Sequence, residues 1–187
     1  MTNIGYLSRP TRLGHLLLAA SDEGLCLLEV DSEDGAEDSL YRLERSGADL
    51  SEGGTAVAQA AEEVDAYLAG RLKAFSVPID LSLTRPFARR VLTSLKKVGW
   101  GELTSYGELA TRQRTGPRAV GGAVRSNPVA IVVPCHRVVA ADGSLGGFSS
   151  GLELKRALLA IEGHEGLAGG WEPRRRHLSR PSTKLGA

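Results

Sequence analysis

The stretch SYGELATRQRTGPRAVGGAVRSNP, residues 105–128, decides the fold of the second half of the chain. It begins with the capping-box pattern Ser-x-x-Glu, which predicts a short helix over about 105–112. A turn through Thr-Gly-Pro at 115–117 follows, and a second helix is expected over about 118–125. This helix should end before Asn127, because a residue that precedes proline avoids helical geometry. Two short helices joined by a tight turn predict a helix-turn-helix.

Two further helices are predicted on either side of this pair. One begins at Pro86, since proline is favoured at the first helical position, and ends by Gly99. A second capping-box pattern at 150–153 predicts a helix that ends at Gly163. We therefore expect a mostly helical C-terminal domain over residues 81–165. The apolar face of its first helix is formed by Phe87, Val91, Leu92 and Leu95.

The first 80 residues show a different pattern. The apolar runs 13–20 and 24–30 are separated by turn residues, which predicts a β-hairpin. The acidic segment 31–39 is poor in large apolar residues and is predicted to be a surface loop. Residues 55–69 have apolar side chains at helical spacing, with a threonine as the expected N-cap. The sequence therefore predicts an N-terminal α/β domain, a small sheet plus helices, over residues 1–80, and nothing in it is predicted to be catalytic.

Charge is distributed unevenly along the chain. Residues 1–84 hold 6 Lys and Arg against 15 Asp and Glu, whereas residues 85–187 hold 17 against 7. A basic half favours a polyanionic partner such as a nucleic acid. The alternative is that the two halves neutralise each other across a shared interface.

The lengths of the apolar runs and the number of cysteines indicate the cellular location of the protein. No stretch approaches the roughly 20 apolar residues of a membrane span, so we expect no membrane association. The two cysteines, Cys26 and Cys135, have no pairing spacing, which favours a reducing compartment and a cytoplasmic protein. Residues 166–187 are rich in glycine and arginine and are predicted to form a basic, loosely ordered tail.

The most reactive candidate lies in residues 131–139, Ile-Val-Val-Pro-Cys-His-Arg-Val-Val. Cys135 precedes His136 and Arg137, and positive neighbours favour the thiolate form of a cysteine. The structural alternative is an inert, buried thiol, as we expect for Cys26 in its apolar run.

Residues 86–165 resemble the active domain of O6-alkylguanine-DNA alkyltransferases, the methylated-DNA–protein-cysteine methyltransferases. The hairpin of the first half resembles the N-terminal α/β domain of that family more weakly. The resemblance implies DNA repair by irreversible transfer of the alkyl group from O6-alkylguanine to a cysteine, and further implies O4-alkylthymine as a second substrate. The motifs, in the order and spacing of the family, are Ser105–Ala110, Arg118–Ala123, Ser126–Pro128, Pro134–Val138 and Ile161–His164.

The resemblance also implies the reacting groups. Cys135 is the acceptor, because a soft thiolate attacks an alkyl carbon well. His136 is the base that reaches the thiol through a water molecule, and Glu162 orients it, as in the Cys–His–acid arrangement of hydrolases. A thioether is a poor leaving group, so each molecule is expected to act once. No cofactor and no metal is expected; the zinc site of some family members would need more ligands than Cys26 and His15.

Double-stranded DNA bearing the lesion is the implied partner, bound through its minor groove by a monomer. The target base must leave the duplex to be reached. Arg118 is expected to fill the vacated stack, and Tyr106 to drive the rotation and bind the flipped guanine. The small residues Ala119 and Gly121 are expected to let their helix approach the DNA closely.

The resemblance implies four further roles around the pocket. Asn127 is expected to act as a hinge between the helix pair and the cysteine segment. The carbonyls of Cys135 and Val138 are expected to accept from the guanine amino group, and Ser149 to donate toward O6. Two alternative functions stay open. One is a lesion sensor that binds the damaged DNA without transferring the alkyl group, and the other is a transcription regulator that uses the helix pair for sequence recognition. The chain departs from many relatives at Phe148, where a tyrosine is common, and at Ala130, where some have proline.

Overall fold

A computed structural model describes residues 2–31, 33–164 and 166 of the chain. The predicted tail therefore lies outside the described residues except for its first residue. The first half has the order β1 (Thr2–Thr11), β2 (Gly14–Ser21), β3 (Gly24–Asp31), α1 (Glu33–Arg45), β4 (Ala48–Glu52) and α2 (Thr55–Leu68). The strands form one sheet in the order β3-β2-β1-β4, in which β4 runs parallel to β1 and the other neighbours are antiparallel.

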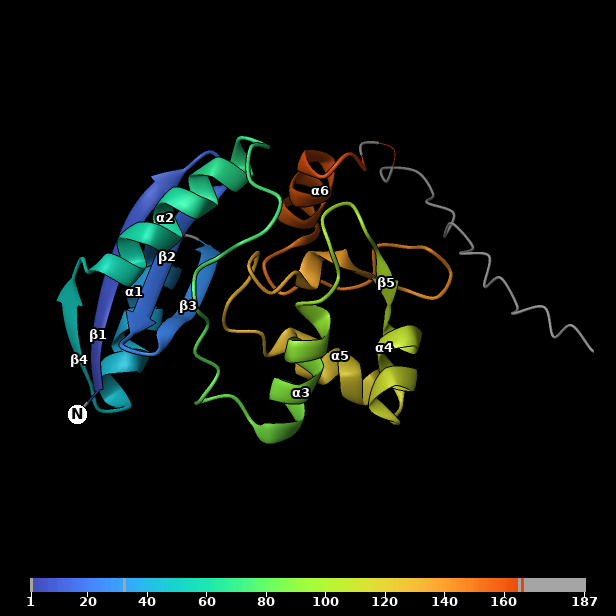
Figure 1. Cartoon of the computed structure of the whole chain (residues 1–187), viewed down its shortest axis with the longest axis horizontal. Helices are drawn as coiled ribbons and strands as arrows, with labels where there is room; N and C mark the ends of the chain where they lie inside the picture. The colour runs from blue at the N-terminus through green and yellow to red at the C-terminus, as the bar shows by residue number, and fades with distance from the viewer. Residues whose placement is uncertain (1, 32, 165, 167–187) are drawn as a thin grey trace, which may run out of the picture.

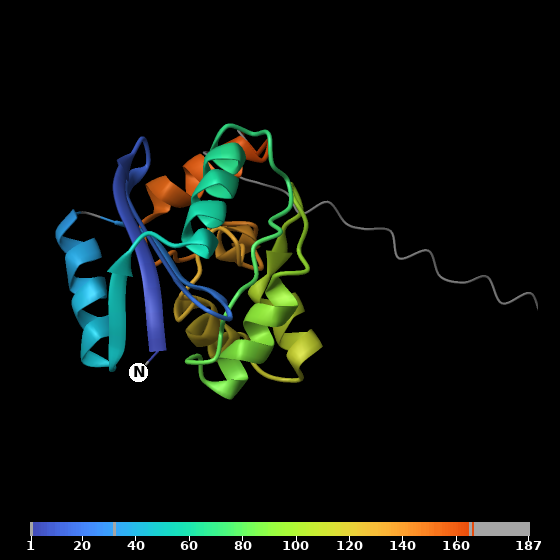
Figure 2. The same cartoon turned by 60° about the vertical axis from the view of Figure 1, so that its left-hand side comes forward.

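Helices cover both faces of this sheet, α1 on one side and α2 on the other (Figure 2). Successive residues of a strand point to opposite faces. Leu17 therefore packs in the cluster under α1, while Leu16 and Leu18 join the main core with α2. All three side chains are fully buried, which explains why β2 is a continuous apolar run and does not alternate with polar residues.

The prediction of a surface loop at 31–39 is wrong, because α1 begins at Glu33. Its apolar residues Ala36, Leu40 and Leu43 recur at helical spacing and pack on the sheet. Asp34, Glu37 and Asp38, which contributed to the loop prediction, are exposed on the other face of this helix. The segment used for the prediction covered only the first part of this helix and so lacked Leu40 and Leu43.

The predicted α/β half followed by a mostly helical half is confirmed (Figure 1). The second half contains α3 (Pro86–Leu95), β5 (Thr104–Ser105), α4 (Tyr106–Gln113), α5 (Pro117–Arg125), a 3-10 turn at Cys135–Arg137, β6 (Val138–Val139) and α6 (Leu152–Ile161). Helices α3, α4 and α5 contact one another, and β5 pairs in parallel with β6.

The helix ends test the predicted caps. At α4 the capping box is confirmed, since Ser105 Oγ accepts from the Glu108 amide and Glu108 Oε2 accepts from the Ser105 amide, at 3.1 and 3.0 Å. The other two predicted caps are wrong. Gly54 and Gly151 occupy the N-cap positions of α2 and α6, with φ of +116° and +86°, and no side chain caps either helix. Glycine adopts such angles without steric cost, so the backbone turn replaces the side-chain cap.

The two halves share one hydrophobic core and are also joined through their backbones. The outer edge of β3 pairs with the segment that leads to the predicted cysteine: the Leu28 amide donates to Pro128 O at 2.8 Å, and the Ala130 amide donates to Leu28 O at 3.0 Å. The sheet therefore supports the region around Cys135. Among the described residues, no helix is long and apolar enough to span a membrane.

Candidate active site

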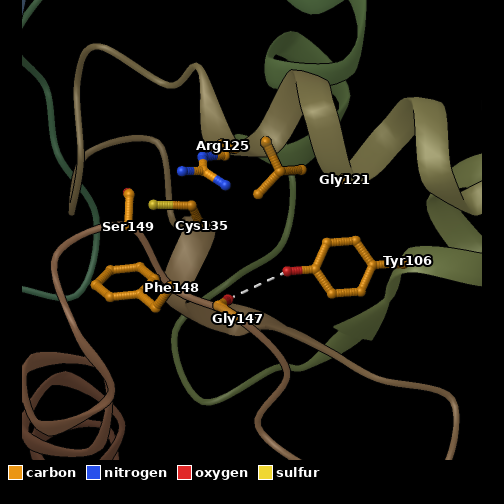
Figure 3. Close-up of a pocket in the computed structure, with 8 residues that line it drawn as sticks. Tyr106, Gly121, Arg125, Cys135, Gly147, Phe148 and Ser149 are labelled. Atoms are coloured by element: carbon orange, nitrogen blue, oxygen red, sulfur yellow. Dashed lines mark hydrogen bonds between the residues drawn. The ribbon is translucent and has the colours of Figure 1, made fainter.

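Cys135 lies in the 3-10 turn that follows Pro134 and borders a cavity of about 290 Å³. Its side chain points toward the space between α5 and the loop at 147–149 (Figure 3). The cysteine residue itself is 5% exposed, so the cavity gives access to a thiol that is otherwise buried. The cavity is lined by Tyr106, Gly121, Val124, Arg125, Cys135, Gly147, Phe148 and Ser149.

Asn127 fixes the segment that carries the cysteine. Its Nδ2 donates to Val133 O at 2.9 Å, and its Oδ1 accepts from the Val129 amide at 3.1 Å. Between these two contacts Ile131 is buried with φ of +69°, a left-handed conformation that a β-branched residue rarely adopts. The side chain of Asn127 thus ties the end of α5 to a tightly folded turn just before Cys135.

His136 and Glu162 form a buried pair behind the cysteine. His136 Nε2 lies 2.9 Å from Glu162 Oε1, and both side chains have 0% exposure. Burial lowers the pKa of His136, although the hydrogen bond to Glu162 acts in the opposite direction. His136 Nδ1 is buried and has no hydrogen-bond partner among the described residues. This ring nitrogen is therefore the one available to accept a proton.

Arg137 holds the other side of Glu162. Its Nε donates to Oε2 at 2.9 Å, its Nη2 donates to Oε1 at 2.7 Å, and its Nη1 donates to Val98 O. Burial alone would raise the pKa of Glu162, but hydrogen bonds from His136 and Arg137 outweigh it and lower this pKa to about 2. The carboxylate is therefore ionised at neutral pH, and Arg137 neutralises it and is fully engaged there, away from the thiol.

The thiol itself is protonated in this resting arrangement. Burial raises the pKa of Cys135, and hydrogen bonds from Asn127 and the backbone, with the charge of Lys155, offset only part of this. Positive neighbours in the sequence therefore do not activate this thiol by themselves, and a base is needed to remove its proton. His136 can perform that task because its lowered pKa keeps the ring neutral at neutral pH. When Nε2 of the neutral ring carries the hydrogen, Nδ1 has a free lone pair that can accept the proton.

The structure brings part of the predicted site together around the cavity. Tyr106, Gly121 and Ser149 border it with Cys135, and Tyr106 Oη donates to Gly147 O at 3.4 Å. Arg118 and Ala119 do not border it; both are exposed in the first turn of α5. A Cβ added at Gly121 would meet nothing within 4 Å, so this face of the helix is uncovered.

Two family models match the chain. One is described as the 6-O-methylguanine DNA methyltransferase, ribonuclease-like domain, over residues 5–81, and the other as the DNA binding domain of the same family, over residues 86–164. A methylated-DNA–protein-cysteine methyltransferase of Mycolicibacterium paratuberculosis is 41% identical over 162 residues, which are 85% of this chain and 92% of that protein. The chain belongs to the 6-O-methylguanine DNA methyltransferase family.

Other family members extend the comparison. A methylated-DNA–protein-cysteine methyltransferase of Sulfolobus acidocaldarius is 46% identical over 99 residues, covering 53% of this chain and 63% of that protein. The crystal structure of Mycobacterium tuberculosis O6-methylguanine methyltransferase superposes with a TM-score of 0.70 at 34% identity, covering 85% of this chain and 92% of that one. The structure of Mycobacterium tuberculosis OGT in complex with DNA gives 0.69 at 34% identity, covering 86% and 92%.

Sequence reasoning missed two buried side chains at the site of this methyltransferase-family chain. Tyr67, from α2, donates to Glu162 Oε1 at 2.8 Å and lies 3.2 Å from His136 Nε2. Its only sequence signal is a position three residues after Val64 on the apolar stripe of α2, where an aromatic residue is expected in the core. The first half was predicted to hold no catalytic residue, and that prediction did not anticipate this contact with the site.

Lys155 is the second missed residue. It is fully buried on α6, and its ammonium donates to Val138 O at 2.6 Å and to Leu145 O. Burial lowers its pKa to about 8, although the nearby thiol group of Cys135 acts in the opposite direction. The Val138 carbonyl, predicted to accept from guanine, thus already accepts one hydrogen bond from Lys155.

Proposed function

We propose that this chain repairs O6-alkylguanine in double-stranded DNA by transferring the alkyl group to Cys135, once per molecule. The observation that carries the proposal is the thiol at a cavity with a buried, ionised Glu162 and a neutral His136 behind it. O4-alkylthymine is a second candidate substrate, since its alkyl group is also bonded to an exocyclic oxygen. The reaction uses side chains of this chain, without a cofactor or a metal.

The chemistry balances with these groups. His136 Nδ1 takes the proton of the Cys135 thiol through a water molecule, and Glu162 stabilises the imidazolium that forms. The thiolate attacks the alkyl carbon, so the S–C bond forms as the C–O6 bond breaks. The electron pair of the broken bond stays on guanine, whose anion is stabilised at O6 by a hydrogen bond from Ser149. This anion takes one proton at N1, delivered through solvent from the imidazolium of His136, which returns to its neutral form. The thioether product has no route back to a free thiol.

The DNA is bound by the second half of the chain, with α4 and α5 as a helix-turn-helix. The exposed first turn of α5 carries Arg118 and Ala119 and is followed by Gly121, which leaves room for a minor-groove backbone close to the helix. Arg118 fills the stack from which the base is rotated, while Tyr106 contacts the flipped guanine beside Cys135. Asn127 keeps the DNA-binding helix in register with the reacting thiol.

Binding to phosphates dominates the affinity, because the second half is strongly basic. Arg118→Ala should weaken binding and lower the single-turnover rate, while the fold is kept because the side chain is exposed.

The protein acts as a monomer in the cytoplasm, where both free thiols stay reduced. Residues 1–80 form the α/β unit in this proposal, and residues 81–165 form the DNA-binding and alkyl-transfer unit.

The decisive experiment is incubation of the protein with duplex DNA that contains one O6-methylguanine, followed by mass spectrometry of the cysteine peptides. One methyl group is expected on Cys135 and none on Cys26, with an equal amount of guanine restored in the DNA. A Cys135→Ser variant should bind the same DNA and leave the lesion intact. Binding by the wild-type protein with an unmodified Cys135 would reject transfer and would fit a lesion sensor instead.

A further inference from the structure

Tyr67 brings a hydroxyl group from the α/β half into the polar cluster behind the cysteine, which consists of Tyr67, His136, Arg137 and Glu162. The tyrosine is fully buried in the last turn of α2. Its ring packs against Phe75 and, in a T-shaped arrangement, against Trp100, with centroid separations of 5.4 and 5.3 Å. The aromatic contacts fix the position of the hydroxyl group before any substrate arrives.

The distances between Tyr67, Glu162 and His136, together with the protonation state of Tyr67, identify the hydrogen-bond donors and acceptors. Tyr67 Oη lies 2.8 Å from Glu162 Oε1 and 3.2 Å from His136 Nε2, and the last two atoms are 2.9 Å apart. Burial and the charge of Glu162 raise the pKa of Tyr67, so its hydroxyl keeps its proton and donates it to the carboxylate. The tyrosine oxygen then offers His136 only lone pairs. Two acceptors face Nε2, so the hydrogen of the neutral ring must be on Nε2 and the free lone pair on Nδ1.

We propose that Tyr67 is a positioning residue for alkyl transfer, which holds His136 in the orientation and tautomer whose Nδ1 accepts the thiol proton. The inference rests on the proposed function and deepens it. Glu162 Oε1 does not bind His136 exclusively, because the same oxygen also accepts hydrogen bonds from the guanidinium of Arg137. A second acceptor, from a different element, fixes the plane of the imidazole ring as well as its distance.

The proposal makes the α/β half a part of the active site. The Tyr67 hydroxyl reaches residues far along the chain, 69 residues away at His136 and 95 at Glu162. The contact exists only when α2 is docked on the second half, where both share one core. Docking of α2 thus completes the proton acceptor, in addition to stabilising the fold.

The test is Tyr67→Phe, which keeps the ring contacts and removes one oxygen. The single-turnover rate constant at saturating O6-methylguanine DNA is expected to fall on the order of ten-fold, as for other groups that orient a reacting residue. The DNA concentration at half-saturation should stay unchanged, because Tyr67 is buried away from the DNA-binding face. Tyr41→Phe is the matched control, since Tyr41 is 60% exposed on α1, and its rate should equal that of the wild type.

A double-mutant cycle separates positioning from packing. The hydroxyl of Tyr67 offers lone pairs to His136 because its own hydrogen is donated to the carboxylate of Glu162. Without that carboxylate the orientation is lost, so Tyr67→Phe should slow transfer by less than about two-fold in a Glu162→Gln background. An equal slowing in both backgrounds would assign the effect to packing and overturn the proposal. An unchanged rate constant for the single variant would overturn it as well.

Nitrogen-15 NMR of the His136 ring in the free protein gives a test that does not depend on activity. The wild-type protein should show a protonated Nε2 and an unprotonated Nδ1 at neutral pH, and Tyr67→Phe should change these signals. A wild-type ring with its hydrogen on Nδ1 rejects the inference even if the variant does not fold. Failure of the wild-type protein to alkylate Cys135, with the expected ring signals, would instead reject the proposed function.

Discussion

The two sides of Cys135 are built in opposite ways. Behind the thiol, the polar cluster of Tyr67, His136, Arg137 and Glu162 is buried and joined by short hydrogen bonds. In front of it, the cavity is bordered mostly by exposed or half-buried groups, with Val124 as a buried exception, and the Tyr106 hydroxyl makes one long contact, 3.4 Å, to Gly147 O.

The difference reflects what each side must do in the proposed reaction. A proton acceptor works best when its orientation is fixed in advance, because no free energy is then spent on arranging it during the reaction. A pocket for a flipped base must be open, since strong internal bonds there would compete with the nucleotide. The polar cluster therefore contributes to stability as well as to chemistry, whereas the cavity residues should contribute mainly to chemistry.

The largest expected effect on stability comes from breaking the polar cluster. Glu162→Gln leaves the buried guanidinium of Arg137 without its counter-charge, which should lower the free energy of unfolding by about 3–5 kcal/mol. Urea denaturation at neutral pH measures this loss. Glu153→Gln is the control, because Glu153 pairs with Arg156 on the surface with 89% of its side chain exposed, and it should cost less than about 0.5 kcal/mol. Equal losses for the two variants would contradict the comparison.

The same carboxylate should produce a pH dependence. The pKa of Glu162 is about 2 in the folded protein against an ordinary value of 4.5, so its stabilisation is complete above pH 4.5 and is lost as the pH falls toward 2. The difference in unfolding free energy between wild type and Glu162→Gln should therefore shrink by about 3 kcal/mol over that range. Urea titrations at a series of pH values test this, and a difference that is constant with pH would contradict a buried, ionised carboxylate.

Substitution of Asn127, the proposed hinge, should have an intermediate effect on stability. Asn127→Ala removes the acceptor for the buried amide of Val129 and one donor to Val133 O, which should cost about 1–3 kcal/mol of unfolding free energy. Transfer should also slow, because the turn that carries Cys135 loses its anchor. Ser126→Ala is the neighbouring control: its hydroxyl bonds to Ala123 O at an exposed position, and stability should change by no more than about 0.5 kcal/mol.

The smallest effect on stability is expected in front of the thiol. Tyr106→Phe removes one long hydrogen bond and should change the unfolding free energy by less than about 0.5 kcal/mol. The single-turnover rate with O6-methylguanine DNA should nevertheless fall, because the hydroxyl is proposed to bind the flipped guanine. A large loss of stability with an unchanged rate would reverse the assignment of the two sides.

Much of the fold could be predicted from local patterns. The capping box of α4, the proline at the start of α3 and the hairpin of β2 and β3 each depend on residues within one turn or one strand pair. The error at α1 has a local cause too, since its apolar residues Leu40 and Leu43 follow the acidic segment used for the prediction. The glycine caps of α2 and α6 escaped prediction because Thr55 and Ser150 suggested side-chain caps at the same places.

The sequence by itself determined the division into an α/β half and a mostly helical half, the reactive cysteine segment and, through the family resemblance of its motifs, the residues expected at the site. The tertiary structure alone decided that Tyr67 completes the polar cluster, that Arg137 is committed to Glu162, and that Lys155 is bonded to Val138 O. The reason is physical: short-range patterns record which face of a helix is apolar. They do not record which distant polar group a buried side chain meets once the two halves pack together.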